Sequence, residues 1–171
     1  MGEITRPNVL DPEFYFTQYV LKAPGDEMLK SLEVSAQMFI DHLNSVQTSK
    51  AGYRYSEGKW TVKQLIQHVT DAERVLVYRA LRFSRGDKTK LLAYDEDLFA
   101  ANDNTEALSL KEVIEELINV RKSTMDLFRN MSIKSLDNVG VADGYQCTPR
   151  LLGWAISGHL IHHLEILKER Y

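Results

Sequence analysis

Apolar residues recur every three or four positions along four long stretches of the chain, over 26–47, 61–86, 109–131 and 148–171. This spacing is typical of amphipathic helices that pack around a common core. A shorter pattern predicts a helix over 14–21, after a start signal at Asp11-Pro12-Glu13, and we expect residues 1–10 to be a loose leader. We therefore divide the chain into a leader with a short helix (1–25) and a helical domain (26–171). No segment shows a convincing strand pattern.

Three of the long stretches begin with recognisable helix-capping residues. Thr61 with Gln64, and Ser109 with Glu112, each have the spacing of a capping box. Thr148 followed by Pro149 suits the start of the last helix. Within the connections, we expect a helical turn over 95–100 and a short extended piece over 132–147.

The connection over 87–108 is far longer than the usual helix–helix loop of about 2–8 residues. A crossover of this length allows the second and third long helices to run in the same direction. The simplest architecture is an all-α four-helix bundle with up-down-down-up topology.

Composition and charge narrow the class of protein. The apolar fraction of 44% and charged fraction of 26% are ordinary for a globular chain. A net charge of −3 without a basic stripe argues against a nucleic-acid partner, and no apolar run reaches membrane-spanning length. With one cysteine, Cys147, and no signal peptide at the start, we expect a protein of the reducing cytoplasm.

Three histidines lie on the apolar stripes of two predicted helices. His159 and His163 are one turn apart, and His68 lies on the inward face of the second long helix. His68 is about 10 Å below the start of its helix and the pair about 13–15 Å above the chain end, so the depths match if the helices are antiparallel. The predicted topology requires that orientation. These histidines therefore predict a metal site, and imidazole ligands suit zinc, nickel, copper and iron.

Alternatives to this metal site remain open at the sequence level. The histidines could be hydrogen-bonded core residues, and a His159–His162 pair could replace His159–His163. Three imidazoles without a cysteine set favour a catalytic site with an open position. Asp71 could orient a ligand or take a proton, although a surface carboxylate is the simpler interpretation. Arg121 could bind a substrate anion, or form a buried ion pair, or lie at the rim.

Two motifs carry a family resemblance: GKWTVKQLIQHVTDAE (Gly58 to Glu73) and HLIHHLEIL (His159 to Leu167). With the middle segment YDEDLFA and Arg121, they resemble the DinB/YfiT-like superfamily of metalloenzymes over nearly the whole chain after about residue 25. The resemblance implies a bundle of the topology above and a divalent metal, usually zinc or nickel, held by His68, His159 and His163. It also implies a homodimer.

The activities implied by the resemblance are of two kinds. One is metal-dependent hydrolysis. The other is transfer of a low-molecular-weight thiol, such as bacillithiol, to a small-molecule electrophile. A different class of function stays open, in which the bundle is non-catalytic and works by binding metal, dimerising or binding a partner.

Overall fold

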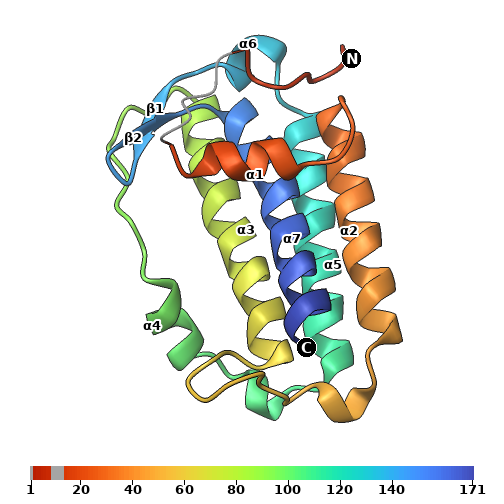
Figure 1. The fold of residues 1–171 in the computed structure, drawn as a ribbon. Coiled ribbons are helices and arrows are strands. Elements are labelled where there is room, and N and C mark those ends of the chain that lie inside the picture. The colour runs from red at the N-terminus through yellow and green to blue at the C-terminus, as the bar shows by residue number, and fades with distance from the viewer. Residues whose placement is uncertain (1, 9–13) are drawn as a thin grey trace.

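Four long helices form the body of the computed structural model, which describes residues 2–8 and 14–171. They are α2 (Met28–Ser45), α3 (Val62–Ser84), α5 (Leu110–Arg129) and α7 (Pro149–Arg170). In Figure 1, α2 and α7 run downward while α3 and α5 run upward. The connection between α3 and α5 returns along the full length of the bundle. The predicted all-α bundle with up-down-down-up topology is confirmed.

Short elements occupy the connections. They are α1 (Phe16–Lys22), η1 (Thr48–Lys50), α4 (Glu96–Ala101), η2 (Thr105–Ala107), α6 (Ile133–Leu136), β1 (Gly140–Ala142) and β2 (Tyr145–Cys147). The strands pair antiparallel, with Val141 opposite Gln146. Asp143 and Gly144 make the turn, both with positive φ, as tight hairpin turns require. This hairpin is the extended piece expected within 132–147, and α4 is the helical turn expected in the crossover.

Both predicted capping boxes are present. The Thr61 side chain accepts from the Gln64 amide and the Gln64 side chain accepts from the Thr61 amide. Ser109 and Glu112 make the same reciprocal pair at the start of α5. Thr148 caps α7 with Pro149 in the first turn. The caps at Thr61 and Thr148 fix where α3 and α7 begin. They therefore also fix how far along the bundle the histidines of these two helices lie.

In the described part of the chain, the core consists of two apolar clusters with a polar layer between them. One cluster surrounds Trp154 and Phe83 at the end where α7 begins, and the other surrounds Phe39 and Leu65 at the opposite end. The polar layer takes buried side chains from all four long helices: Ser31 and Ser35, Glu73, Arg121, and Ser157. Its hydrogen bonds fix the register between the helices.

The expectation of a loose leader is wrong for residues 2–8. Ile4 is only 1% exposed and belongs to the core cluster around Trp154. The Arg6 guanidinium lies 4.3 Å from the Trp154 ring centroid and donates to the carbonyls of Val20 and Ala23. The predicted start signal at 11–13 lies outside the described residues. The first helix itself begins at Phe16 and packs across α7.

Helix α1 approaches α7 very closely at Gly158. A Cβ atom there would lie 1.6 Å from the carbonyl oxygen of Tyr19. This approach brings Tyr19 against the histidines of α7. Among the helices of residues 2–8 and 14–171, none is both long enough and apolar enough to cross a bilayer.

Candidate metal centre

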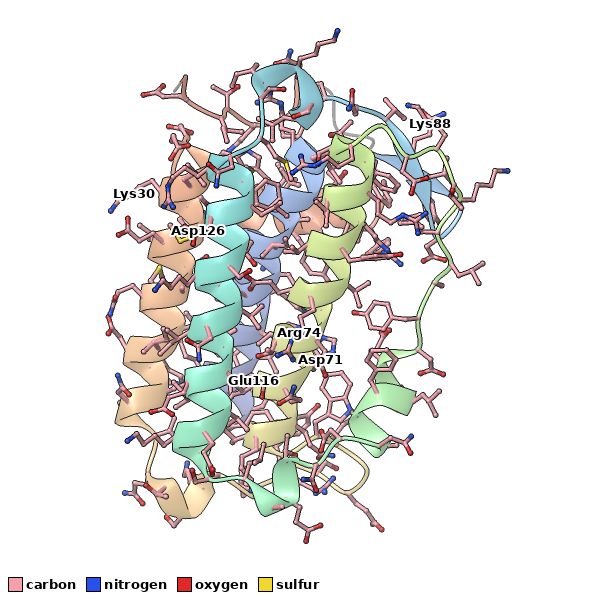
Figure 2. The ribbon with its side chains drawn as sticks, turned by 180° about the vertical axis from the view of Figure 1, so that it is seen from behind. Lys30, Asp71, Arg74, Lys88, Glu116 and Asp126 are labelled. Atoms are coloured by element: carbon pink, nitrogen blue, oxygen red, sulfur yellow. The ribbon has the colours of Figure 1, made fainter. Side chains whose placement is uncertain are left out.

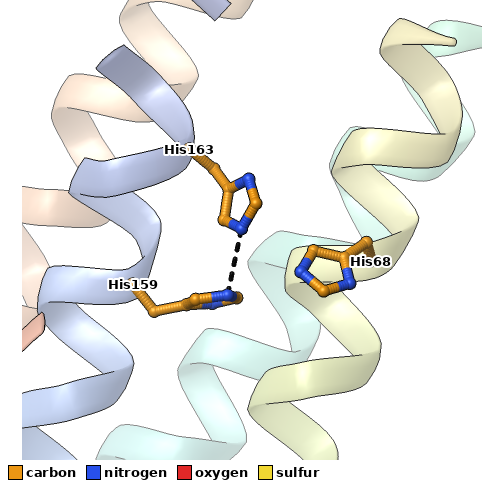
Figure 3. A group of neighbouring side chains, drawn as sticks. All are labelled: His68, His159 and His163. Atoms are coloured by element: carbon orange, nitrogen blue, oxygen red, sulfur yellow. Dashed lines mark hydrogen bonds between the residues drawn. The ribbon is translucent and has the colours of Figure 1, made fainter. Parts of the chain in front are cut away.

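Helices α3 and α7 bring three histidines together (Figure 3). His68 projects from α3, and His159 and His163 project from successive turns of the antiparallel α7. The ring centroid of His68 lies 5.2 Å from that of His159 and 4.8 Å from that of His163. One potential ligand nitrogen from each ring lies within 4.8 Å of the other two. The three residues selected by sequence spacing thus form one cluster.

The geometry of the cluster fits a metal ion. The Nε2 atoms of His159 and His163 are 3.0 Å apart. Two nitrogens bound tetrahedrally to zinc at 2.0–2.1 Å are about 3.3 Å apart, so this pair needs almost no adjustment. A direct hydrogen bond between the two nitrogens uses the lone pair of only one of them. A shared cation would use both, and the residues present therefore fit such an ion.

All three imidazoles are held neutral, which is the form that binds metal. Burial lowers the pKa of His68 to about 4, although the charge of Asp97 acts in the opposite direction. Burial, followed by the neighbouring histidines, lowers the pKa values of His159 and His163 well below the ordinary value. The cluster can therefore offer lone pairs across the neutral range.

Aromatic rings hold the histidines in place. The Trp60 ring lies over His68 at a centroid distance of 4.5 Å, and Tyr19 meets the His159 ring edge-on at 5.0 Å. His163 is buried, and its Nδ1 atom has no hydrogen-bond partner in the part of the chain that the structure describes. Its ring orientation therefore comes from packing rather than from a hydrogen bond to the second nitrogen.

A cavity of about 370 Å³ opens beside the cluster. It is lined by all three histidines and by residues from four segments outside the bodies of α3 and α7, among them Tyr15, Phe16, Tyr19, Trp60, Tyr94, Glu96 and Asp143. This volume lies within the range of small-molecule sites. The histidines thus form one wall of a chamber that a substrate could enter.

His162 is not part of the tight cluster. Its ring lines the cavity and lies 5.5 Å from Tyr19, and burial lowers its pKa. The close group of possible ligands among the described residues comprises His68, His159 and His163 alone. The alternative His159–His162 pair is therefore not the one that the structure assembles.

Arg121 does not reach the cavity, so the idea that it binds a substrate anion is corrected. It is 4% exposed and its Nε and Nη2 donate to the two carboxylate oxygens of Glu73, at 2.9 and 2.8 Å. Its Nη1 donates to the carbonyl of Leu32 and to Ser35. The structure favours the buried ion pair, the alternative that the sequence left open. The partner, Glu73, lies on α3, so the helical pattern of α5 could not reveal it.

Asp71 faces away from the histidines, which corrects its expected role beside the metal. Figure 2, drawn from behind, shows it with Arg74 and Glu116 on the face formed by α3 and α5. Arg74 donates to Asp71 at 3.0 Å and to Glu116 at 2.6 Å, and Gln67 also donates to Asp71. Asp71 is a surface carboxylate in an ion-pair network, the simpler of the two interpretations.

Sequence reasoning missed most of the cavity wall, including Arg79. Ala72, Leu76 and Arg79 follow His68 at four, eight and eleven residues, so all four lie on one face of α3. That spacing was the available signal. The tyrosines of α1 and of the crossover gave none, because only the tertiary fold brings those segments to the histidines.

The fold and the cluster define a four-helix-bundle protein with a histidine triad of metal-binding geometry. Residues 31–167 match the family model of the DinB superfamily, and the chain belongs to that family. Over 112 residues it is 24% identical to "Putative metal-dependent hydrolase OB0413" of Oceanobacillus iheyensis. That match covers 65% of this chain and spans 64% of the length of the relative.

Solved structures share the fold. YfiT from Bacillus subtilis, described as a probable metal-dependent hydrolase with an unusual four-helix bundle topology, superposes with a TM-score of 0.69 at 15% identity, over 99% of this chain and 92% of its own. A mycothiol-dependent maleylpyruvate isomerase gives a TM-score of 0.62 at 19% identity, over 80% of this chain and 58% of its own. The four-helix bundle protein TT2238 superposes with a TM-score of 0.59 at 23% identity, over 82% of this chain and 95% of its own.

Proposed function

We propose that this protein is a divalent-metal-dependent enzyme that holds zinc or nickel through His68, His159 and His163 and acts on a small molecule. The observation that supports this most strongly is the convergence of the three imidazoles at the wall of a cavity of about 370 Å³. Three protein ligands are typical of catalytic zinc, whereas structural zinc usually has four.

The chemistry that the ion would supply is activation of a nucleophile, because it lowers the pKa of a bound water or thiol toward neutral pH. The residues of the chain would bind the ion and the substrate and would orient both. Trp60 and Tyr19 hold the rings of His68 and His159, and aromatic side chains line the cavity that would receive the substrate.

Two reactions are compatible with this proposal. Hydrolysis is the activity named for OB0413 and YfiT. Thiol transfer is the second, and the thiol dependence named for the maleylpyruvate isomerase is the reason to test it. The non-catalytic bundle predicts a site closed by side chains, and the cavity beside the histidines argues against that alternative.

The experiment compares thiol-dependent and thiol-independent turnover by protein prepared without a histidine tag and loaded with zinc or nickel. Consumption of monochlorobimane that requires added bacillithiol would support thiol transfer. Hydrolysis of activated esters without a thiol would support the hydrolase. Either activity should fall in His163→Ala to the level of metal-depleted protein and should persist in His42→Ala, which changes a histidine remote from the cavity. Equal turnover by both variants would contradict the proposal.

A further inference from the structure

A buried arginine lies in the same cavity as the histidines. Arg79 is 3% exposed, lines the cavity, and lies on the same face of α3 as His68. Eleven residues separate the two, which corresponds to about 16 Å along the helix axis at a rise of ~1.5 Å per residue. His68 and Arg79 therefore line the same cavity from backbone positions about three turns apart on one helix.

Within residues 2–8 and 14–171, no carboxylate forms an ion pair with Arg79. Among the residues that the structure describes, its guanidinium makes one hydrogen bond, from Nη2 to the carbonyl oxygen of Leu92 at 3.0 Å. None of the ion pairs within 4.0 Å between described residues includes it. The acidic side chains that line the cavity in the described part of the chain, Glu96 and Asp143, are both exposed. A buried cation in this state is costly, unlike Arg121 with its bidentate partner.

Two tyrosines, Tyr15 and Tyr94, line the same cavity as Arg79. The charge of Arg79 acts on the hydroxyl groups of both Tyr15 and Tyr94, although burial, the larger effect, raises the pKa of each. For Tyr94 the pKa rises to about 12, so its phenol stays protonated at neutral pH and can donate a hydrogen bond. A guanidinium fork with neutral phenols beside it has the composition of a carboxylate-binding site.

We propose that Arg79 is a substrate-binding residue that selects a small molecule carrying a carboxylate. This inference rests on the proposed function, since it concerns the substrate of the same cavity. The carboxylate would accept two hydrogen bonds from the guanidinium, while the reacting group, several bonds away, would face the histidines. The walls formed by Phe16, Tyr19 and Leu76 would contact the apolar body of the molecule.

The test is calorimetric binding of 3-phenylpropionate and of 3-phenylpropan-1-ol, which has the same shape without the charge. Zinc-loaded wild type should bind the carboxylate roughly ten- to a hundredfold more tightly than the alcohol, as expected for hydrogen bonds to a charged group. Arg79→Gln should remove this preference. Arg79→Lys should keep part of it, because a lysine retains the charge but not the fork. Arg85→Gln, which removes an exposed arginine at the end of the same helix, should behave as the wild type.

Several results would overturn the inference. They are failure of 3-phenylpropionate to bind the wild type, equal affinity for the two probes, and a carboxylate preference that survives in Arg79→Gln, which would place the anion on the metal or elsewhere. Thermal unfolding of each variant checks folding. If Arg79→Gln is unfolded, the carboxylate preference of Arg79→Lys decides the matter: a reduced preference supports the inference, and an unchanged preference contradicts it. Zinc content is measured on the same samples, and the titration is repeated on metal-depleted protein. Failure of the metal site is thereby detected separately from failure of the carboxylate site.

Discussion

At the scale of single residues, the two buried arginines show what a sequence can and cannot reveal. Arg121 and Arg79 both lie on inward faces of their helices. Arg121 has a bidentate carboxylate partner, whereas among the described residues Arg79 donates to one carbonyl. Helical spacing predicts that each points inward. Helical spacing cannot predict the partner of Arg121, because Glu73 comes from another helix and its position depends on how the four long helices pack. The three histidines were predictable because two lie on one helix and the topology constrains the third.

The Arg121–Glu73 pair should matter for stability rather than for binding. Glu73→Ala leaves a guanidinium buried without a counter-charge, and we expect the free energy of unfolding to fall by about 3–5 kcal/mol. The matched control is Glu115→Ala, which breaks an exposed pair with Lys111 on α5 and should cost at most about 0.5 kcal/mol. Urea unfolding of both variants measures this. Similar losses in the two would contradict the assigned role.

Cys147 should be a poor nucleophile at neutral pH. Burial raises the pKa of its thiol to about 11, although the charge of Arg79 acts in the opposite direction. At pH 8 only about one thiol in a thousand is then ionised, and alkylation by iodoacetamide should be slow and should accelerate with pH toward 11. Mass spectrometry follows the labelling, with urea-unfolded protein as the control that reacts quickly. A native rate equal to the unfolded rate at pH 8 would show that the thiol is accessible and unperturbed.

At the scale of elements, the long helices were predictable to within a few residues, because local capping residues determine where they start. Thr61 with Gln64 and Ser109 with Glu112 need no tertiary information to act. The packing of residues 2–8 and of α1 on α7 was not predictable. It depends on contacts between positions far apart in sequence, such as the Trp154 indole donating to the Thr5 carbonyl at 3.0 Å.

The contact between α1 and α7 can be tested at Gly158. Gly158→Ala should destabilise the protein by about 1–3 kcal/mol, because the new Cβ would collide with the backbone of Tyr19. Alanine is otherwise the better helix former by roughly 1 kcal/mol. The control is Gly153→Ala, whose Cβ meets the flexible end of Met28 and should cost less. Denaturant unfolding compares the two, and an unchanged or raised stability in Gly158→Ala would refute the close approach.

At the scale of the whole molecule, topology is what makes the site. The long crossover lets α3 and α5 run in parallel, and α7 then lies antiparallel to α3 with its histidine pair at the height of His68. Sequence supported this arrangement through loop length and helix depth. The cavity was not foreseeable, because its walls come from α1, the start of α3, the crossover and the hairpin turn. The homodimer implied by the family resemblance stays a prediction that sedimentation equilibrium would check.

The measurement that tests the central claim most directly is the metal content of protein purified without a histidine tag, by inductively coupled plasma mass spectrometry. We expect about one zinc or nickel ion per chain in the wild type and in His42→Ala, and close to none in His68→Ala or His163→Ala. The bound ion should also raise the melting temperature of the wild type, and EDTA should reverse this. A wild type that takes up no metal from zinc-containing buffer, or a His163→Ala variant with full occupancy, would contradict the account.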